Sequence, residues 1–235
     1  MLEHQGDISD AILSGWIVTW PTRLLALIWL AWVVSWVVAS FWSGRTKAHV
    51  RTLDSWVYRL PILIGGILLS PWTSRALGES RLYDPGNGGT YLLAVVLVCG
   101  ISFTWWARIH LGRFWSNAIT HKEDHRIIDT GPYGMVRHPI YTGLILAILA
   151  TGVAVATISS LLGALCIAFG EWQKARMEEG FLSAELGQEA YGLYRRRVPM
   201  IVPFLTVFRA APKADVESAT AKSSAKSNVK PKSAP

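Results

Sequence analysis

The stretch from His125 to Gly143 reads HRIIDTGPYGMVRHPIYTG, and it separates two long apolar parts of the chain. It is polar and rich in turn-forming residues, with a turn predicted at Gly131-Pro132. Pro139 fits the first turn of a helix, where its missing N–H costs nothing. The free N–H groups of this helix start, together with Arg137 and His138, favour a carboxylate or phosphate ligand. We therefore expect a ligand site where this helix enters the membrane.

The composition is typical of a membrane protein. Of the 235 residues, 51% are hydrophobic and 17% are charged, and the mean hydropathy is +0.30. The net charge of +7 suits basic cytoplasmic loops, and no basic patch interleaved with aromatic residues indicates a nucleic-acid partner. Cys99 and Cys166 lie in apolar segments and predict neither a disulfide nor a thiolate site. The first 20 residues lack the basic start of a cleavable signal peptide.

The apolar segments predict an all-α, polytopic membrane protein with about five transmembrane helices. Uncharged or nearly uncharged segments occupy residues 24–42, 60–74, 86–107 and 139–170. A single helix over the last of these would be about 48 Å long at about 1.5 Å per residue, well beyond a hydrocarbon core of about 30 Å. We therefore expect it to turn at residues 156–160, so that residues 139–172 form a helical hairpin of two spans.

The distribution of Lys and Arg predicts the orientation. The loops after the first and third spans and the segment after the fifth are basic, whereas the N-terminus and the second loop contain fewer Lys and Arg residues. By the positive-inside rule, the N-terminus lies outside, and the C-terminus and cofactor site face the cytoplasm. Trp29, Trp32 and Trp36 follow helical spacing and predict a lipid-facing or packing face rather than a site.

The chain order suggests four parts. Residues 1–20 form an N-terminal segment, and residues 21–110 contain three transmembrane helices. Residues 111–205 form a catalytic core with the hairpin and one or two amphipathic interfacial helices, interrupted near Gly187. Residues 212–235 are rich in Lys, Ala and Ser without periodicity, which predicts a disordered tail able to contact anionic lipid.

The 125–143 stretch resembles the signature of the isoprenylcysteine carboxyl methyltransferase and phospholipid methyltransferase family of membrane enzymes. Two further blocks of that signature follow in order, Glu178-Glu179 and the YGLYRRRVP run at residues 191–199. The resemblance covers about residues 105–203, and three ordered blocks make it specific. It implies methyl transfer from S-adenosylmethionine to a lipid-like or small apolar acceptor, by family resemblance the carboxyl group of a prenylcysteine-like substrate.

The resemblance also implies which residues act. Those expected to bind the cofactor are His125, Arg126, Ile127, Ile128, Tyr133, His138, Pro139, Ile140, Tyr141, Glu178 and Glu179. Those expected to serve catalysis are Arg137, Lys174 and Arg176. The family places an Arg at the position of Lys174, where it contacts the acceptor. Because an ammonium cannot hold a carboxylate by two points as a guanidinium does, the acceptor group stays open among carboxylate, amine, thiol and phenol.

These residue types suit the chemistry. Methyl transfer is an in-line displacement that depends mainly on positioning. Arg137 and His138 could hold the carboxylate of the donor, Tyr133 and Tyr141 offer aromatic faces to a cation, and Glu178 could accept from a hydroxyl or ammonium. A glycine at position 143, one turn into the helix, would let a ligand approach the backbone.

Simpler explanations remain for several of these residues. An interfacial histidine such as His125 is often structural, and Glu178-Glu179 could be a solvated helix face. The spacing of His121, Asp124 and His125 could suit a metal, but a charged loop explains it better, so no metal is expected.

Two other functional classes also stay open for the whole protein. Membrane sterol and enone reductases that use NADPH carry a similar Arg-His-Pro-x-Tyr-x-Gly block, and a non-catalytic membrane protein is the second alternative.

Overall fold

The computed structural model describes residues 20–41, 52–112 and 127–203, and all regular structure in these ranges is helical. The predicted tail, the loop residues 113–126 and almost all of the predicted N-terminal segment lie outside the described residues. The helices are α2 (Trp20–Ser40), α3 (Thr52–Leu69), α4 (Pro71–Ala76), α5 (Gly86–Leu111), α6 (Pro132–Met135), α7 (Pro139–Val155), α8 (Ile158–Glu185) and α9 (Gln188–Arg197).

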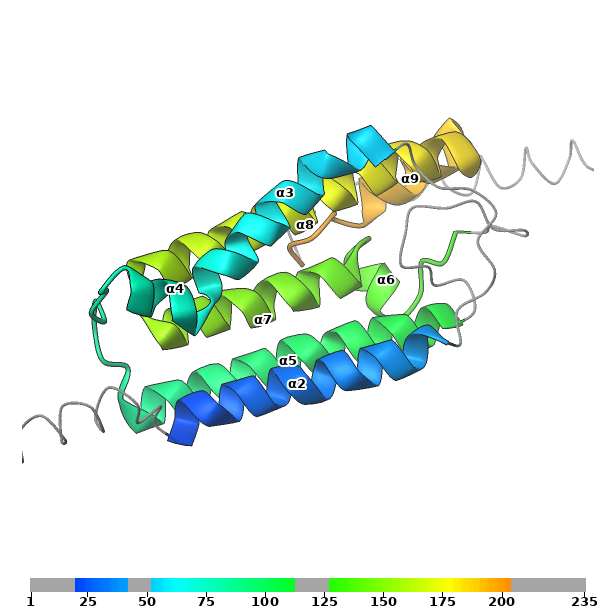
Figure 1. Ribbon diagram of the computed structural model, residues 1–235. Helices are drawn as coiled ribbons and strands as arrows, with labels where there is room; N and C mark the ends of the chain where they lie inside the picture. Colours follow the sequence, from blue (N-terminus) through cyan, green and yellow to red (C-terminus); the bar gives the residue numbers. More distant parts are fainter. Residues whose placement is uncertain (1–19, 42–51, 113–126, 204–235) are drawn as a thin grey trace, which may run out of the picture.

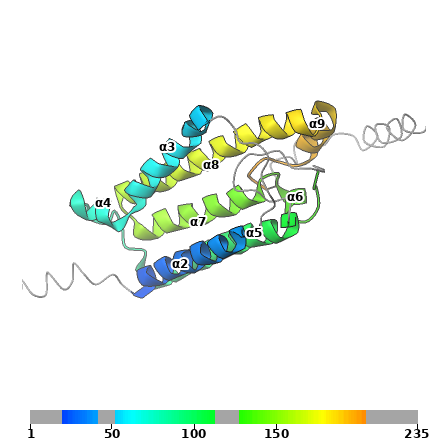
Figure 2. The ribbon, with the colours of Figure 1, turned by 45° about the vertical axis from the view of Figure 1, so that its right-hand side comes forward.

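The long helices lie roughly along one direction in layers, with α3 beside α8, α7 in the middle and α5 beside α2 (Figure 1). The view turned by 45° shows the same neighbours (Figure 2). The short helices α6 and α9 lie at one end of the bundle, and α4 lies at the other. The start of α7, where the central motif ends, is therefore at the α6–α9 end.

Glycines allow the closest helix contacts. Gly100 of α5 and Gly143 of α7 face each other, and a Cβ on either would clash with the backbone of the other helix. Gly65 of α3 and Gly163 of α8 form the equivalent contact on the opposite side. The prediction that Gly143 lets a ligand approach is wrong, because α5 fills that space. Small residues at such contacts let helix backbones approach each other, as in other membrane helix pairs.

Two of the described helices are long and apolar enough to cross a membrane, Arg23–Ser40 within α2 and Gly86–Leu111, which is α5. Two shorter apolar helical segments, Ser55–Leu69 and Pro139–Val155, lie in α3 and α7. The tryptophans of α2 form a packing face: Trp29 and Trp32 donate hydrogen bonds to threonines of α7 and α5, at 3.0 and 3.2 Å. This matches the packing alternative predicted for them.

The helix boundaries differ from expectation in two places. The predicted span 60–74 is interrupted, because α3 ends at Leu69 and Ser70 caps the new helix α4 through the N–H of Thr73. The hairpin was expected to end at residue 172, but α8 runs without a break through Glu185. Between α7 and α8, Ala156 adopts a left-handed conformation (φ 59°) and Thr157 forms a capping box with Ser160. Gly187 (φ 87°) precedes α9.

Candidate functional site

The site is built around the start of α7. His138 precedes Pro139, the first residue of the helix, and the backbone N–H groups of Arg137 and His138 donate to the carbonyl oxygens of Pro199 and Met200, at 2.8 and 3.1 Å. The segment that follows α9 is thereby held against the entry to α7. These two N–H groups are not free for an anion, contrary to the simplest expectation for this helix start.

Glu179 of α8 is the centre of a buried polar cluster. Arg137 donates to both of its carboxylate oxygens, Nε to Oε1 at 2.8 Å and Nη2 to Oε2 at 2.9 Å. Tyr191 donates its hydroxyl to Oε1 at 3.0 Å, His138 Nε2 lies 3.0 Å from the same oxygen, and Arg195 Nε lies 3.0 Å from Oε2. The residue is only 6% exposed. A buried carboxylate needs this number of donors to offset its lost hydration.

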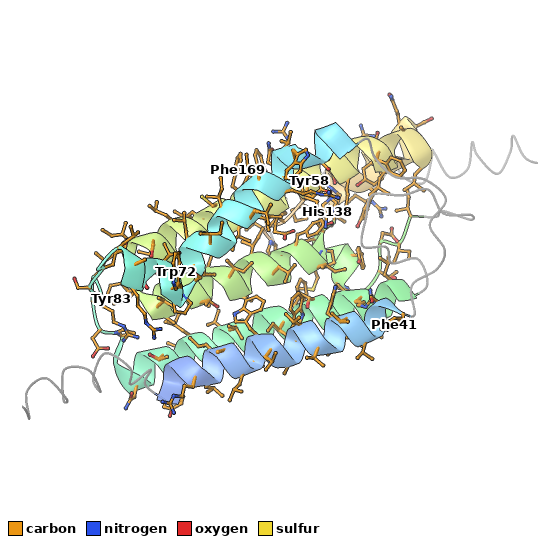
Figure 3. All side chains as sticks on the ribbon, viewed as in Figure 1. Phe41, Tyr58, Trp72, Tyr83, His138 and Phe169 are labelled. Carbon is orange, nitrogen blue, oxygen red and sulfur yellow. The ribbon has the colours of Figure 1, made fainter. Side chains whose placement is uncertain are left out.

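Glu178 lies beside Glu179 and shares His138 with it. The Tyr141 hydroxyl donates to Glu178 Oε1, and His138 Nδ1 lies 3.5 Å from Glu178 Oε2. The rings of His138 and Tyr141 are stacked, with centroids 5.7 Å apart. His138, itself 5% exposed, therefore connects the two carboxylates. Figure 3 shows His138 at the α9 end of the bundle, toward α3 and α8.

Lys174 lies one turn before Glu178 on α8. Its Nζ is 5.1 Å from the centroid of the Tyr141 ring and 5.8 Å from that of Tyr58 on α3, which are cation–π distances. Arg176 is exposed on another face of α8, with its guanidinium 4.9 Å from the Trp172 ring centroid. The fold therefore brings Lys174 to the cluster and leaves Arg176 apart from it.

The other residues that were predicted to bind the cofactor lie at the start of α7, on α6, just before α6, or outside the described residues. Pro139 is buried and Ile140 half-buried at the start of α7. Tyr133 of α6 accepts the Tyr194 hydroxyl at its backbone oxygen, at 2.7 Å. Ile127 packs against the hydrophobic cluster that contains Tyr194, and Ile128 is half-buried. His125, Arg126 and the alternative metal set with His121 and Asp124 lie outside the described residues.

The family model for isoprenylcysteine carboxyl methyltransferase matches residues 92–183, which include α7 and most of α8. The nickel-cobalt-cadmium resistance protein NccN of Alcaligenes xylosoxydans xylosoxydans is 31% identical over 160 residues, which are 67% of this chain and 71% of the relative. The chain belongs to the isoprenylcysteine carboxyl methyltransferase family.

Two further relatives align with similar fractions of this chain. The protein-S-isoprenylcysteine O-methyltransferase of Schizosaccharomyces pombe is 27% identical over 180 residues, 75% of this chain and 67% of the relative. The cobalt-zinc-cadmium resistance protein CzcN of Cupriavidus metallidurans is 28% identical over 163 residues, 68% of this chain and 71% of the relative. Within the described ranges, no group of three or more His, Cys, Asp or Glu side chains is placed to hold a metal ion.

The pKa values of the cluster follow from its hydrogen bonds. Burial alone would raise the pKa of Glu179, but the bonds from His138 and Arg137 outweigh it and lower that pKa to about 2. Burial also opposes ionisation of Glu178, whose pKa is lowered by the hydrogen bond with His138 and by nearby positive charge. Burial would lower the pKa of His138, but the two glutamates raise it above its ordinary value. The cluster therefore favours two carboxylates with a protonated histidine between them.

This family member should have a stability maximum between about pH 5 and pH 6.5 in detergent. Because the pKa of Glu179 is lowered, its stabilisation is present above the ordinary pKa of about 4.5 and is lost as pH falls toward 2. Because the pKa of His138 is raised, its stabilisation is full below about 6.5 and is lost as pH rises through the folded-state value. Thermal unfolding midpoints across pH 3–9 measure the loss of stability on the acid side and on the alkaline side. His138→Gln should remove the loss on the alkaline side. If that loss is unchanged in the variant, His138 is not its cause.

The sequence assigned no role to three residues of this site. Tyr191 and Arg195 lie in the YGLYRRRVP run without a role of their own, and Tyr58, which lies 5.8 Å from Lys174, is outside the motif blocks. Tyr191 and Arg195 contact Glu179 from α9, which reaches it only because the chain turns back at Gly187. Nothing in the local spacing of these residues indicates that contact.

Proposed function

We propose that this protein transfers the methyl group of S-adenosylmethionine to a lipid-like or small apolar acceptor at the membrane interface. The family name suggests a prenylcysteine-like acceptor and carboxyl O-methylation. The observation that carries the proposal is the position of Glu178, which is held by Tyr141 and His138 at the start of α7 and flanked by Lys174. The same residues form the central and downstream blocks of the family resemblance.

The side chains present fit the cofactor by their chemistry. S-adenosylmethionine supplies a methyl group on a sulfonium sulfur and presents an ammonium and ribose hydroxyls. Glu178 is the carboxylate suited to accept from an ammonium or hydroxyl, and its lowered pKa keeps it ionised. Tyr133 presents an aromatic ring suited to a sulfonium, whereas the Tyr141 ring already stacks on His138 and has the Lys174 ammonium at cation–π distance. Holding donor and acceptor in line and excluding water are the main contributions that such a site makes.

We assign Arg137 a positioning role rather than a catalytic one. Its Nε and Nη2 bind Glu179, and its Nη1 donates to the carbonyl oxygens of Arg195 and Val198. A guanidinium with this many internal contacts has little capacity left for a ligand. Arg137 and Glu179 together fix the α7 entry against α8 and α9, which orients His138 and, through it, Glu178.

We further propose five membrane spans, formed by α2, α3 with α4, α5, α7 and the first part of α8, with α7 and α8 as the hairpin. The N-terminus lies outside and the C-terminus in the cytoplasm. The basic segments and the α6–α9 end of the bundle then share the cytoplasmic side, because α9 itself ends in Arg195, Arg196 and Arg197. A cytoplasmic cofactor would reach the site from that side.

Purified protein should bind S-adenosylmethionine or its demethylated product, S-adenosylhomocysteine. The full chain in one detergent can be titrated calorimetrically with each sulfur nucleotide and, separately, with NADPH. Saturable binding of a sulfur nucleotide supports the methyltransferase assignment. Binding of NADPH without binding of either sulfur nucleotide would replace it with the reductase alternative.

A further inference from the structure

Glu171 of α8 is a buried carboxylate that the proposed site has not used. It is only 9% exposed, and its Oε2 has no hydrogen-bond partner among the described residues. An unsatisfied buried polar atom costs about 1–3 kcal/mol, more when the group is charged. Such an atom in a native structure needs an explanation, and an ionisable residue at membrane depth points to function.

The position of Glu171 connects it to the proposed site. Glu171, Lys174 and Glu178 follow the i, i+3, i+7 spacing that places side chains on one face of a helix. The Glu171 carboxylate interacts electrostatically with Lys174 and with Tyr141 of α7. On the other side, α3 approaches closely, with the backbone oxygen of Tyr58 against Gly170. The titratable groups that interact with Glu171 are therefore Lys174, Glu178 and Tyr141, and α3 packs against this part of α8.

The Glu171 carboxylate offsets the positive charge that Lys174 would present to an acceptor. Its ammonium lies between the Tyr58 and Tyr141 rings and within the field of the Glu171 carboxylate. The Lys174 ammonium and the Glu171 carboxylate together carry almost no net charge. A carboxylate acceptor would bring a second negative charge toward Glu171, which like-charge repulsion disfavours. An uncharged acceptor with a proton to donate would instead satisfy Glu171 Oε2, which has no partner in the described part of the chain.

We propose that Glu171 is the catalytic base on the acceptor side, and that the acceptor atom is the sulfur of a thiol or the nitrogen of an uncharged amine on an apolar body. This rests on the proposed methyltransferase function. As the acceptor forms its bond to the methyl carbon, the bond from that carbon to the sulfonium sulfur breaks and its electron pair stays on sulfur. The proton of the acceptor passes to the Glu171 carboxylate. The sulfonium cation, the neutral acceptor and the carboxylate become a neutral thioether, a neutral methylated acceptor and a neutral carboxylic acid, so charge and atoms balance.

Three acceptors with the same farnesyl tail distinguish the acceptor groups: farnesyl thiol, farnesylamine and N-acetyl-S-farnesylcysteine, whose acceptor is a carboxylate. Full-chain protein in lipid nanodiscs would be assayed with radiolabelled S-adenosylmethionine. We expect methylation of the thiol or the amine in preference to the carboxylate. Glu171→Gln should reduce that turnover by about 100-fold or more and abolish its loss at low pH, as expected when a general base is removed. The exposed Glu189 of α9 supplies the control Glu189→Gln, which should behave like the parent.

A binding measurement tests the charge argument without turnover. With S-adenosylhomocysteine present, Glu171→Gln should bind N-acetyl-S-farnesylcysteine about tenfold more tightly than the parent, because one negative charge is gone. A purely structural glutamate would not produce a gain. If Glu171→Gln does not purify, Glu171→Asp retains the carboxylate and should keep the preference for the thiol or the amine.

The outcomes separate this inference from the function on which it rests. A parent protein that binds no sulfur nucleotide contradicts the proposed function itself. A parent that binds the nucleotide but methylates only the carboxylate acceptor, or neither the thiol nor the amine, contradicts the inference alone. Unchanged turnover and pH profile in Glu171→Gln would also overturn it.

Discussion

Replacing Arg137 by alanine should lower the free energy of unfolding by about 3–5 kcal/mol, the usual effect of removing one partner of a buried ion pair. Glu179 would lose its two-point contact while remaining buried, and the segment after α9 would lose the bonds from Nη1 to Arg195 and Val198. For a chain of this size, that change corresponds to roughly 6–20 °C in the thermal midpoint. Thermal unfolding of parent and variant in the same detergent measures it.

Arg197→Ala is the matched control. Arg197 also pairs with a carboxylate, Asp129, at 3.0 Å, but the side chains of the two are 47% and 39% exposed. Exposed ion pairs contribute at most about 1 kcal/mol, so this variant should unfold close to the parent temperature. If both arginine variants shift the midpoint equally, Glu179 is not the energetic centre of the cluster.

His138→Ala and Tyr141→Phe should each weaken binding of S-adenosylmethionine by about ten- to a hundredfold. Both residues contact Glu178, and loss of a hydrogen bond to a charged group costs about 1.5–3 kcal/mol. Lys174→Ala should leave cofactor binding near that of the parent, since its predicted contact is the acceptor. Calorimetric titration of the three variants in one detergent makes the comparison.

Tyr83→Phe provides a control for loss of a tyrosine hydroxyl. Tyr83 donates to the Val153 backbone oxygen at 2.6 Å and lies at the opposite end of the bundle from His138 (Figure 3). It should bind the cofactor like the parent. If His138→Ala and Tyr141→Phe also bind like the parent, these residues are structural and the site assignment is wrong, even though the family stands.

The local features of the fold were predictable because they depend on near neighbours in the chain. Apolar segments of helical length predicted an all-helical structure. The left-handed Ala156 with the Thr157 cap separates α7 from α8 within the residues where the uncharged segment was expected to turn. The interruption after Leu69 and the unbroken course of α8 past residue 172 were not predicted. The first depends on a cap at Ser70, and the second on packing along α3, which hydropathy does not describe.

The residues of the cluster were mostly predictable, whereas their partners were not. The ordered motif blocks identified Arg137, His138, Tyr141 and the two glutamates. It was not possible to tell that Arg137 would bind Glu179, because the two are 42 positions apart and meet only when α7 and α8 pack. Nor did spacing distinguish Lys174, which faces Tyr141, from Arg176, which does not.

The sequence by itself determined the helical class, the family and the residues from which the candidate site is made, since these follow from hydropathy, turn chemistry and motif order. Only the tertiary structure decided how those residues share their hydrogen bonds. Close glycine contacts between α5 and α7 and between α3 and α8 set the helix spacing. That spacing brings Glu179 its donors, whereas one oxygen of Glu171 has no donor among the residues that the structure describes. Hydrogen bonds form only within about 3 Å, so the roles of these side chains depend on packing between helices that are distant in the sequence.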